Sequence, residues 1–139
     1  MRHEVIMYRV VRDIHFSYGH RLAKHAGKCS RLHGHNARVQ IEISSERLDE
    51  QDMVLDFEHI SETIGEWIRK ELDHKMLLWK KDPAAAVLKK AGEEIVLLKK
   101  HPTAEVLAKI IFEEARNLRL PVSKVTFWET ANSQAIYHE

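Results

Sequence analysis

The deciding stretch of this chain reads C-S-R-L-H-G-H-N-A-R-V-Q-I-E-I-S over residues 29–44. After its two histidines, apolar residues alternate with polar ones, which is typical of a strand with one buried and one solvated face. Residues two apart in an extended chain point to the same side, so His33 and His35 aim their imidazoles together, with only Gly34 between them. The stretch therefore predicts a strand over residues 33–44 that begins with two candidate metal ligands at the edge of its buried face.

A third histidine, His20, ends the upstream segment F-S-Y-G-H. Three imidazoles on zinc leave one coordination position open, which is the arrangement of catalytic zinc sites. A structural alternative makes Cys29 the fourth ligand and closes the site. Lys28 and Arg31 flank this thiol, and nearby cations favour the reactive thiolate form. The spacing alone leaves the open site and the closed site as alternatives.

The composition is that of an ordinary globular protein, and we expect a single domain over residues 1–139. With 22 basic and 21 acidic residues, the chain lacks the charge footprint of a nucleic-acid-binding protein. No apolar run approaches the length of a membrane span, so we expect no membrane segment. A single cysteine excludes an internal disulfide and favours a reducing cytoplasm.

The patterns along the rest of the chain predict an α+β fold. Strands are expected over residues 5–16, 33–44, 122–130 and 134–138, and a loop over 17–32. Helices are expected from Asp56 to about residue 72, from Pro83 to Lys90, and from Thr103 to before Pro121. Residues 94–98 are expected to form either an edge strand or a connector. Strand pairs that flank helices favour a four-stranded antiparallel sheet with helices on one face. The exposed edges of such a sheet favour an oligomer joined edge to edge.

Two further positions carry groups that could do chemistry. Asp73 and His74 stand at the predicted end of a helix, where compensation of the helix dipole by His74 is the simpler explanation. Glu129 ends an apolar stripe with Val125 and Phe127, and a carboxylate there is costly unless it is paired. A guanidine-like heterocycle with two adjacent N–H donors would satisfy it, as would a partner arginine or solvent at the strand end.

Six short motifs follow one another along nearly the whole chain. They are F-S-x-x-H at 16–20, C-x-x-x-H-G-H at 29–35, M-V-x-D-F at 53–57, L-D-H at 72–74, P-T-x-E at 102–105, and W-E-T followed by a tyrosine at 128–137. In this order they resemble the 6-pyruvoyl-tetrahydropterin synthase superfamily, and within it the bacterial and archaeal 6-carboxy-tetrahydropterin synthases of queuosine biosynthesis. The chain departs from many members at residues 77–79, where an asparagine is common, and in a longer segment over 79–101.

The resemblance implies the tunnelling fold, in which sheets from several subunits join into a β-barrel. Such proteins are commonly hexamers built from two trimers, with active sites between subunits. The implied site residues are His20, His33 and His35 for zinc, Cys29 as general base, Asp73 and His74 as a second proton-handling pair contributed by a neighbouring chain, Glu129 as the pterin anchor, and Thr103 or Glu105 as pocket residues.

The implied reaction converts 7,8-dihydroneopterin triphosphate and water to 6-carboxy-5,6,7,8-tetrahydropterin, acetaldehyde and triphosphate. The candidates for holding the triphosphate are Arg21, Lys24, Lys28 and Arg31. One alternative is a 6-pyruvoyl-tetrahydropterin synthase, which eliminates triphosphate and keeps the side chain. The other is a zinc-stabilised, pterin-binding oligomer without turnover.

Overall fold

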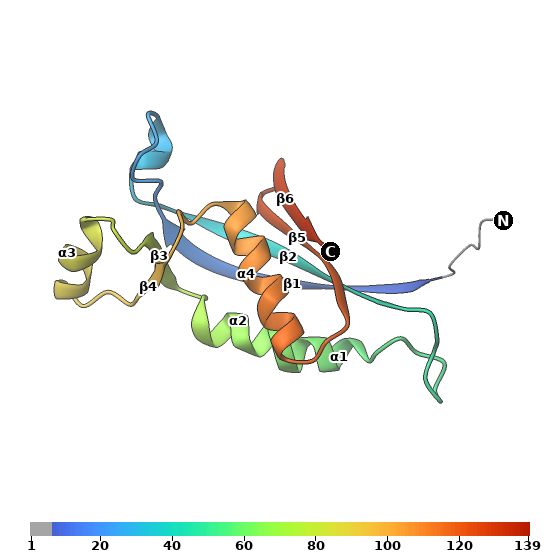
Figure 1. Cartoon of the computed structure of the whole chain (residues 1–139). Helices are drawn as coiled ribbons and strands as arrows, with labels where there is room; N and C mark the ends of the chain where they lie inside the picture. Colours follow the sequence, from blue (N-terminus) through green and yellow to red (C-terminus); the bar gives the residue numbers. More distant parts are fainter. Residues whose placement is uncertain (1–6) are drawn as a thin grey trace.

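A computed structural model describes residues 7–139, and Figure 1 shows one curved sheet with helices packed along it. The six strands lie in the order β4-β3-β1-β2-β5-β6. They are β1 Tyr8–His20, β2 His33–Ser45, β3 Lys75–Trp79, β4 Ile95–Leu98, β5 Val122–Thr130 and β6 Ser133–His138. The helices are α1 Phe57–Ile60, α2 Glu66–Glu71, α3 Ala84–Lys90 and α4 Ala104–Asn117. The α+β class is confirmed, while the predicted beginning of the first strand at residue 5 lies outside the described residues.

The prediction of a four-stranded antiparallel sheet is wrong, because two more strands lie beside β1. Strand β3 runs parallel to β1, and β4 runs parallel to β3 after a crossover through α3. Alternation could not reveal β3, since a parallel strand buried on both faces reads as a continuous apolar run. Its residues Leu77 and Leu78 are both fully buried. The segment over 94–98 is the edge strand β4.

Strands β1 and β2 form a long antiparallel hairpin that carries the histidines. The register places His20 opposite His33 and Tyr18 opposite His35. The strand predicted over 33–44 is confirmed, but the loop predicted over 17–32 is too long, because β1 continues to its last residue, His20. Directly opposed residues share one face of a sheet, so these four rings lie on the same side.

Two side-chain caps fix where the principal helices begin, as the sequence predicted. The Asp56 carboxylate accepts a hydrogen bond from the amide of Glu58 at 2.9 Å, and the helix then runs through a π-helical turn into α2. The Thr103 hydroxyl oxygen accepts one from the amide of Val106 at 3.2 Å, at the start of α4. Each cap satisfies a helix N–H group that has no partner within the helix.

One face of the sheet carries the hydrophobic core. Helices α1, α2 and α4 pack against this face, where Ile41, Phe127 and Ile111 are fully buried (Figure 1). The opposite face of β2 presents polar side chains, among them Arg38 and Gln40. Among the described residues, no helix combines the length and the apolar character that crossing a membrane would need.

The segment over 79–101 builds α3 and β4 and is tied to the hairpin by an ion pair. Arg21, directly after β1, donates two hydrogen bonds to the carboxylate of Asp82, one of them from Nε to Oδ2 at 2.7 Å. The Asp82 side chain is fully buried and also accepts from the amide of Ala84 at 2.8 Å, at the start of α3. The Arg21 guanidinium holds the pKa of Asp82 below its ordinary value. This ion pair therefore anchors the start of α3 beside the end of β1.

Candidate metal centre

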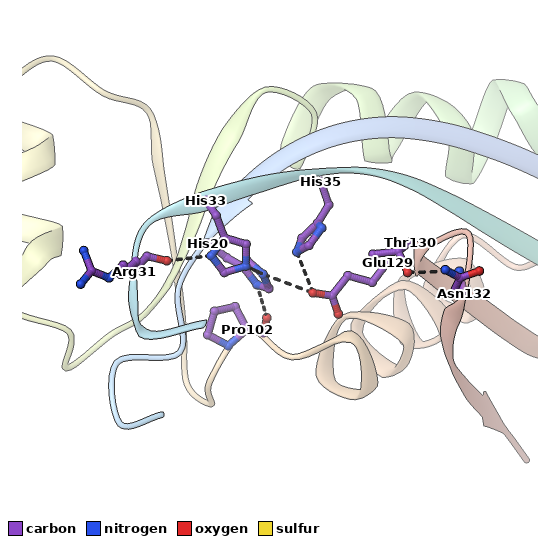
Figure 2. A network of polar contacts seen from close by, with 8 residues as sticks. All are labelled: His20, Arg31, His33, His35, Pro102, Glu129, Thr130 and Asn132. Carbon is purple, nitrogen blue, oxygen red and sulfur yellow. Dashed lines mark hydrogen bonds and ion pairs between the residues drawn. The ribbon is translucent and has the colours of Figure 1, made fainter. Parts of the chain in front are cut away.

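Three imidazoles and one carboxylate meet where β1 ends and β2 begins. The ligand atoms of His20, His33, His35 and Glu129 all lie within 4.8 Å of one another. Figure 2 shows His35 and the Glu129 carboxylate directed at each other beside the other two rings. The sequence predicted that the three histidines would converge, but it did not place Glu129 with them.

Two backbone carbonyls fix which nitrogen carries the proton in two of the rings. The Nδ1 of His20 lies 2.7 Å from the Pro102 oxygen, and the Nδ1 of His33 lies 2.7 Å from the Arg31 oxygen (Figure 2). A carbonyl only accepts, so each Nδ1 carries an N–H and donates it. In the neutral rings both Nε2 atoms are then lone-pair acceptors, yet they face each other at 3.0 Å. Two lone pairs repel at this distance unless a shared cation lies between them, and neutral imidazoles held by carbonyls are typical of metal ligands.

His35 also fits a metal ligand. Its Nε2 is buried and lies 2.7 Å from Oε1 of Glu129, but the geometry is not that of a hydrogen bond, so this nitrogen has no hydrogen-bond partner in the described part of the chain. Burial lowers the pKa of His35 against the opposing charge of Glu129, and a neutral ring is the form that binds metal. Imidazole nitrogens with a carboxylate are donors that zinc accepts in a tetrahedral site. The four residues together fit a bound divalent ion.

Glu129 reaches the group from β5 with 25% of its side chain exposed. Its oxygen Oε1 lies 3.5 Å from Nε2 of His20, and the imidazoles, His20 foremost, hold the pKa of Glu129 below its ordinary value. Within residues 7–139 its ion-pair partners are histidines, with no lysine or arginine among them. The partner arginine considered as an alternative is therefore not found in this part of the chain.

Tyr18 packs against the same rings from the core side. Its ring centroid lies 5.1 Å from that of His20 and 5.7 Å from that of His35. Burial first, and then the charge of Glu129, raise the pKa of the Tyr18 phenol, so it stays protonated at neutral pH. The hydroxyl is buried and has no hydrogen-bond partner among the residues that the structure describes.

Cys29 lies outside the four-residue group. It is half-buried in a short 3-10 turn, Lys28–Ser30, and its carbonyl accepts from the amide of Leu22 at 2.7 Å. The metal-competent group found among residues 7–139 does not include its sulfur. The geometry therefore gives no support to the closed site with Cys29 as fourth ligand, because the fourth member of the group is Glu129.

Asp73 and His74 form a close carboxylate–imidazole pair fastened to β1. The helix has ended by this point and His74 has a φ of +59°, which turns its ring so that Nδ1 lies 3.0 Å from Oδ2 of Asp73. Ser17 holds the pair, since its amide donates to Oδ1 of Asp73 at 2.9 Å and its carbonyl accepts from the His74 amide at 2.7 Å. Burial alone would raise the pKa of Asp73, but these hydrogen bonds together hold it below its ordinary value. The positive φ of His74 and its contact with Asp73 set where this imidazole lies beyond the helix end.

The imidazole of His74 is 81% exposed and lines an open pocket of about 480 Å³. Ser17, Gly19 and Gly34 also line this pocket, and alternation places them on the sheet face opposite the imidazoles of the metal group. Glu129 is not among its lining residues, but His33 and His35 of the metal group are. Within one chain, the Asp73–His74 pair therefore shares this pocket with two residues of the metal group, although Ser17, Gly19 and Gly34 lie on the sheet face opposite the imidazole rings.

Two of the remaining candidate residues, Thr103 and Arg21, already have partners within the fold. Thr103 follows Pro102, which contacts His20, but its hydroxyl oxygen is engaged in capping α4. Arg21 is committed to Asp82. Among residues 7–139, the other loop cations considered for triphosphate make no ion pair, and Lys24 has its Nζ 4.9 Å from the ring centroid of Trp79.

Comparison with known proteins agrees with this geometry. The profile of the family described as 6-pyruvoyl tetrahydropterin synthase matches residues 9–139. A 6-carboxy-5,6,7,8-tetrahydropterin synthase of Aquifex aeolicus is 36% identical over 129 residues, which cover 84% of this chain and 79% of that protein. One from Haemophilus influenzae is 28% identical over 141 residues and covers 96% and 100%. The solved structure of Caenorhabditis elegans 6-pyruvoyl tetrahydropterin synthase superposes with a TM-score of 0.74 at 22% identity, covering 99% of each chain, and so shares the fold.

Proposed function

The chain belongs to the 6-pyruvoyl tetrahydropterin synthase family, and we propose that it is a zinc-dependent 6-carboxy-5,6,7,8-tetrahydropterin synthase. It would convert 7,8-dihydroneopterin triphosphate and water to 6-carboxytetrahydropterin, acetaldehyde and triphosphate, a step of queuosine biosynthesis in the cytoplasm. The observation that carries this proposal is the pair of imidazole Nε2 atoms facing each other at 3.0 Å, with each Nδ1 held by a carbonyl. The names of the relatives supply the product.

His20, His33 and His35 would hold the zinc ion. When bound, zinc acts as a Lewis acid that stabilises negative charge on substrate oxygens. The carbonyls of Pro102 and Arg31 orient two of the imidazoles, so the ligand set is ordered before the substrate arrives.

Glu129 would bind the pterin ring. An ionised carboxylate accepts two parallel N–H donors, and a pterin presents such donors on its exocyclic amine and the adjacent ring nitrogen. The low pKa of Glu129 keeps the carboxylate ionised at neutral pH, as this role requires.

Cys29 and His74 would move protons during the internal redox step and the elimination. Oδ2 of Asp73 lies 3.0 Å from Nδ1 of His74, so Nε2 is the ring nitrogen that would exchange a proton with substrate. It would serve the metal group of a neighbouring subunit, because Ser17, which holds the pair, lies on the sheet face opposite the imidazole rings of its own chain. We propose the tunnelling-fold hexamer, two trimers joined through a β-barrel, as the assembly that brings the two halves together.

Product analysis tests the proposal. Zinc-loaded protein incubated with 7,8-dihydroneopterin triphosphate should release acetaldehyde and form the 6-carboxy product in equal amounts. Formation of a 6-pyruvoyl product without acetaldehyde would identify the elimination reaction instead. Retention of zinc and pterin binding with no product at all would identify a non-catalytic oligomer.

A further inference from the structure

Glu129 stands in the position of a fourth metal ligand, a role different from anchoring the pterin. We propose that Glu129 ligates the metal in the substrate-free protein and that pterin binding withdraws it, so that the coordination position opens only when the ring is in place. The inference rests on the proposed function for its choice of ligand. Neither the family resemblance nor the names of the relatives assign this role to the residue.

The distances in the group match a four-coordinate site. Metal–ligand bonds of about 2.0–2.1 Å in a tetrahedron place neighbouring donor atoms about 3.3 Å apart. Three of the six separations lie near this value: 3.0 Å between the Nε2 atoms of His20 and His33, 2.7 Å from His35 Nε2 to Oε1 of Glu129, and 3.5 Å from His20 Nε2 to that oxygen, and all four ligand atoms lie within 4.8 Å of one another. One small cation at the centre would satisfy all four atoms.

The electrostatics of Glu129 point the same way. A half-buried carboxylate is costly without a cationic partner, and in the described part of the chain its partners are two imidazoles. The Nε2 of His35 makes no hydrogen bond to this carboxylate at 2.7 Å, so a neutral His35 ring faces the carboxylate without donating a proton to it. A divalent ion between Glu129 and His35 would neutralise the carboxylate and give the Nε2 of His35 a partner.

The two roles of Glu129 compete. Accepting two parallel N–H donors requires both carboxylate oxygens to face the edge of the ring, whereas Oε1 now faces the imidazoles of His35 and His20 at 2.7 Å and 3.5 Å. When the pterin ring binds, it therefore replaces the metal as the partner of Glu129. An enzyme built in this way keeps its metal four-coordinate and closed to stray ligands until its own substrate arrives.

The test uses cobalt(II) in place of the native metal, since its visible absorption bands report the ligand set. The probe is 6-methylpterin, which has the ring N–H donors but no hydroxylated side chain that could itself ligate the metal. Wild-type cobalt protein should change its spectrum when 6-methylpterin binds. Glu129→Gln should already show an altered spectrum without pterin and should hold cobalt at least about tenfold more weakly in chelator competition. The matched control Glu113→Gln, an exposed carboxylate on α4, should behave as wild type in both measurements.

Two results would overturn the inference. One is an equal cobalt affinity and spectrum for Glu129→Gln and wild type, which removes the ligand role. The other is a wild-type spectrum that stays unchanged at saturating 6-methylpterin, which removes the exchange. Neither result affects product formation from the true substrate, so the proposed function is judged separately by the acetaldehyde assay.

Discussion

The Nδ1 atom of His20 lies 2.7 Å from the carbonyl oxygen of Pro102, so the segment that starts α4 orients an imidazole at the end of β1. The two residues are 82 positions apart, and the contact is buried. Because the carbonyl receives the Nδ1 proton, the ring presents Nε2 to the other imidazoles. The start of α4 is thus part of the metal centre, although it contributes no ligand.

Thr103, which caps α4 directly after Pro102, should be important for stability. Thr103→Ala removes the acceptor for the Val106 amide and should lower the free energy of unfolding by about 1 kcal/mol. Thr103→Ser keeps the hydroxyl and should stay close to wild type. Denaturant titration of the three proteins measures the difference, and equal unfolding midpoints for the Ala and Ser variants would show that the cap contributes nothing.

The Arg21–Asp82 pair should make stability depend on pH in a defined direction. The folded-state pKa of Asp82 lies below its ordinary value of 3.8, so the stabilisation is present above that value and is lost as the pH falls through the folded pKa. Asp82→Asn should cost about 2 kcal/mol at neutral pH, because Arg21 loses its partner while remaining 24% exposed to water. The difference between wild type and variant should shrink below about pH 4.

Unfolding measured from pH 7 down to pH 3 tests this expectation. The matched control is Glu66→Gln, which breaks the exposed pair with Arg69 and should change stability little at any pH. A wild-type advantage over Asp82→Asn that persists undiminished to pH 3 would contradict the assigned role.

Tyr18 offers a substitution that should stabilise the protein. Its hydroxyl is buried without a hydrogen-bond partner, so folding removes it from water without compensation. Tyr18→Phe keeps the ring packing against His20 and should raise the free energy of unfolding by about 1 kcal/mol. Thermal and denaturant unfolding of metal-free protein measure this, and a clear loss of stability would indicate that the hydroxyl has a partner in the assembled protein.

Mixed oligomers test whether two subunits share one active site. His33→Ala disables the metal group and His74→Ala disables the proton-handling pair, so each variant alone should be inactive. After subunit exchange at equal amounts, about one quarter of the sites should combine an intact metal group from one chain with an intact pair from another. Acetaldehyde release should recover to that extent. Its absence from oligomers that mass spectrometry shows to be mixed would mean that both groups act within one chain.

The parts of the fold that the sequence predicted are those governed by local patterns. Alternation over residues 37–43 sufficed for β2, and the caps at Asp56 and Thr103 located two helix starts. Strand β3 could not be predicted, because its apolar run M-L-L-W has no alternation and because its parallel partner, β1, is distant in sequence. Residues 17–20 were expected in a loop because glycine and histidine interrupt the apolar pattern, although pairing with β2 holds them in the strand.

In the site, too, local spacing predicted some features, while others depend on contacts between distant parts of the chain. The spacing of His33 and His35 sufficed to predict that their rings share a face, since that depends only on the period of a strand. The parity of Glu129 with Phe127 indicated a carboxylate on the buried face, but which group it meets depends on the register between β2 and β5. The partnership of Arg21 with Asp82, 61 residues apart, left no local signal at all.

Elemental analysis of protein purified without chelators tests the metal centre most directly. Wild type and His33→Ala are prepared side by side, and circular dichroism confirms that both are folded. The arrangement of the four side chains predicts about one zinc ion per wild-type chain and almost none in the variant. Metal-free wild type, or a His33→Ala protein that keeps its zinc, would contradict the account.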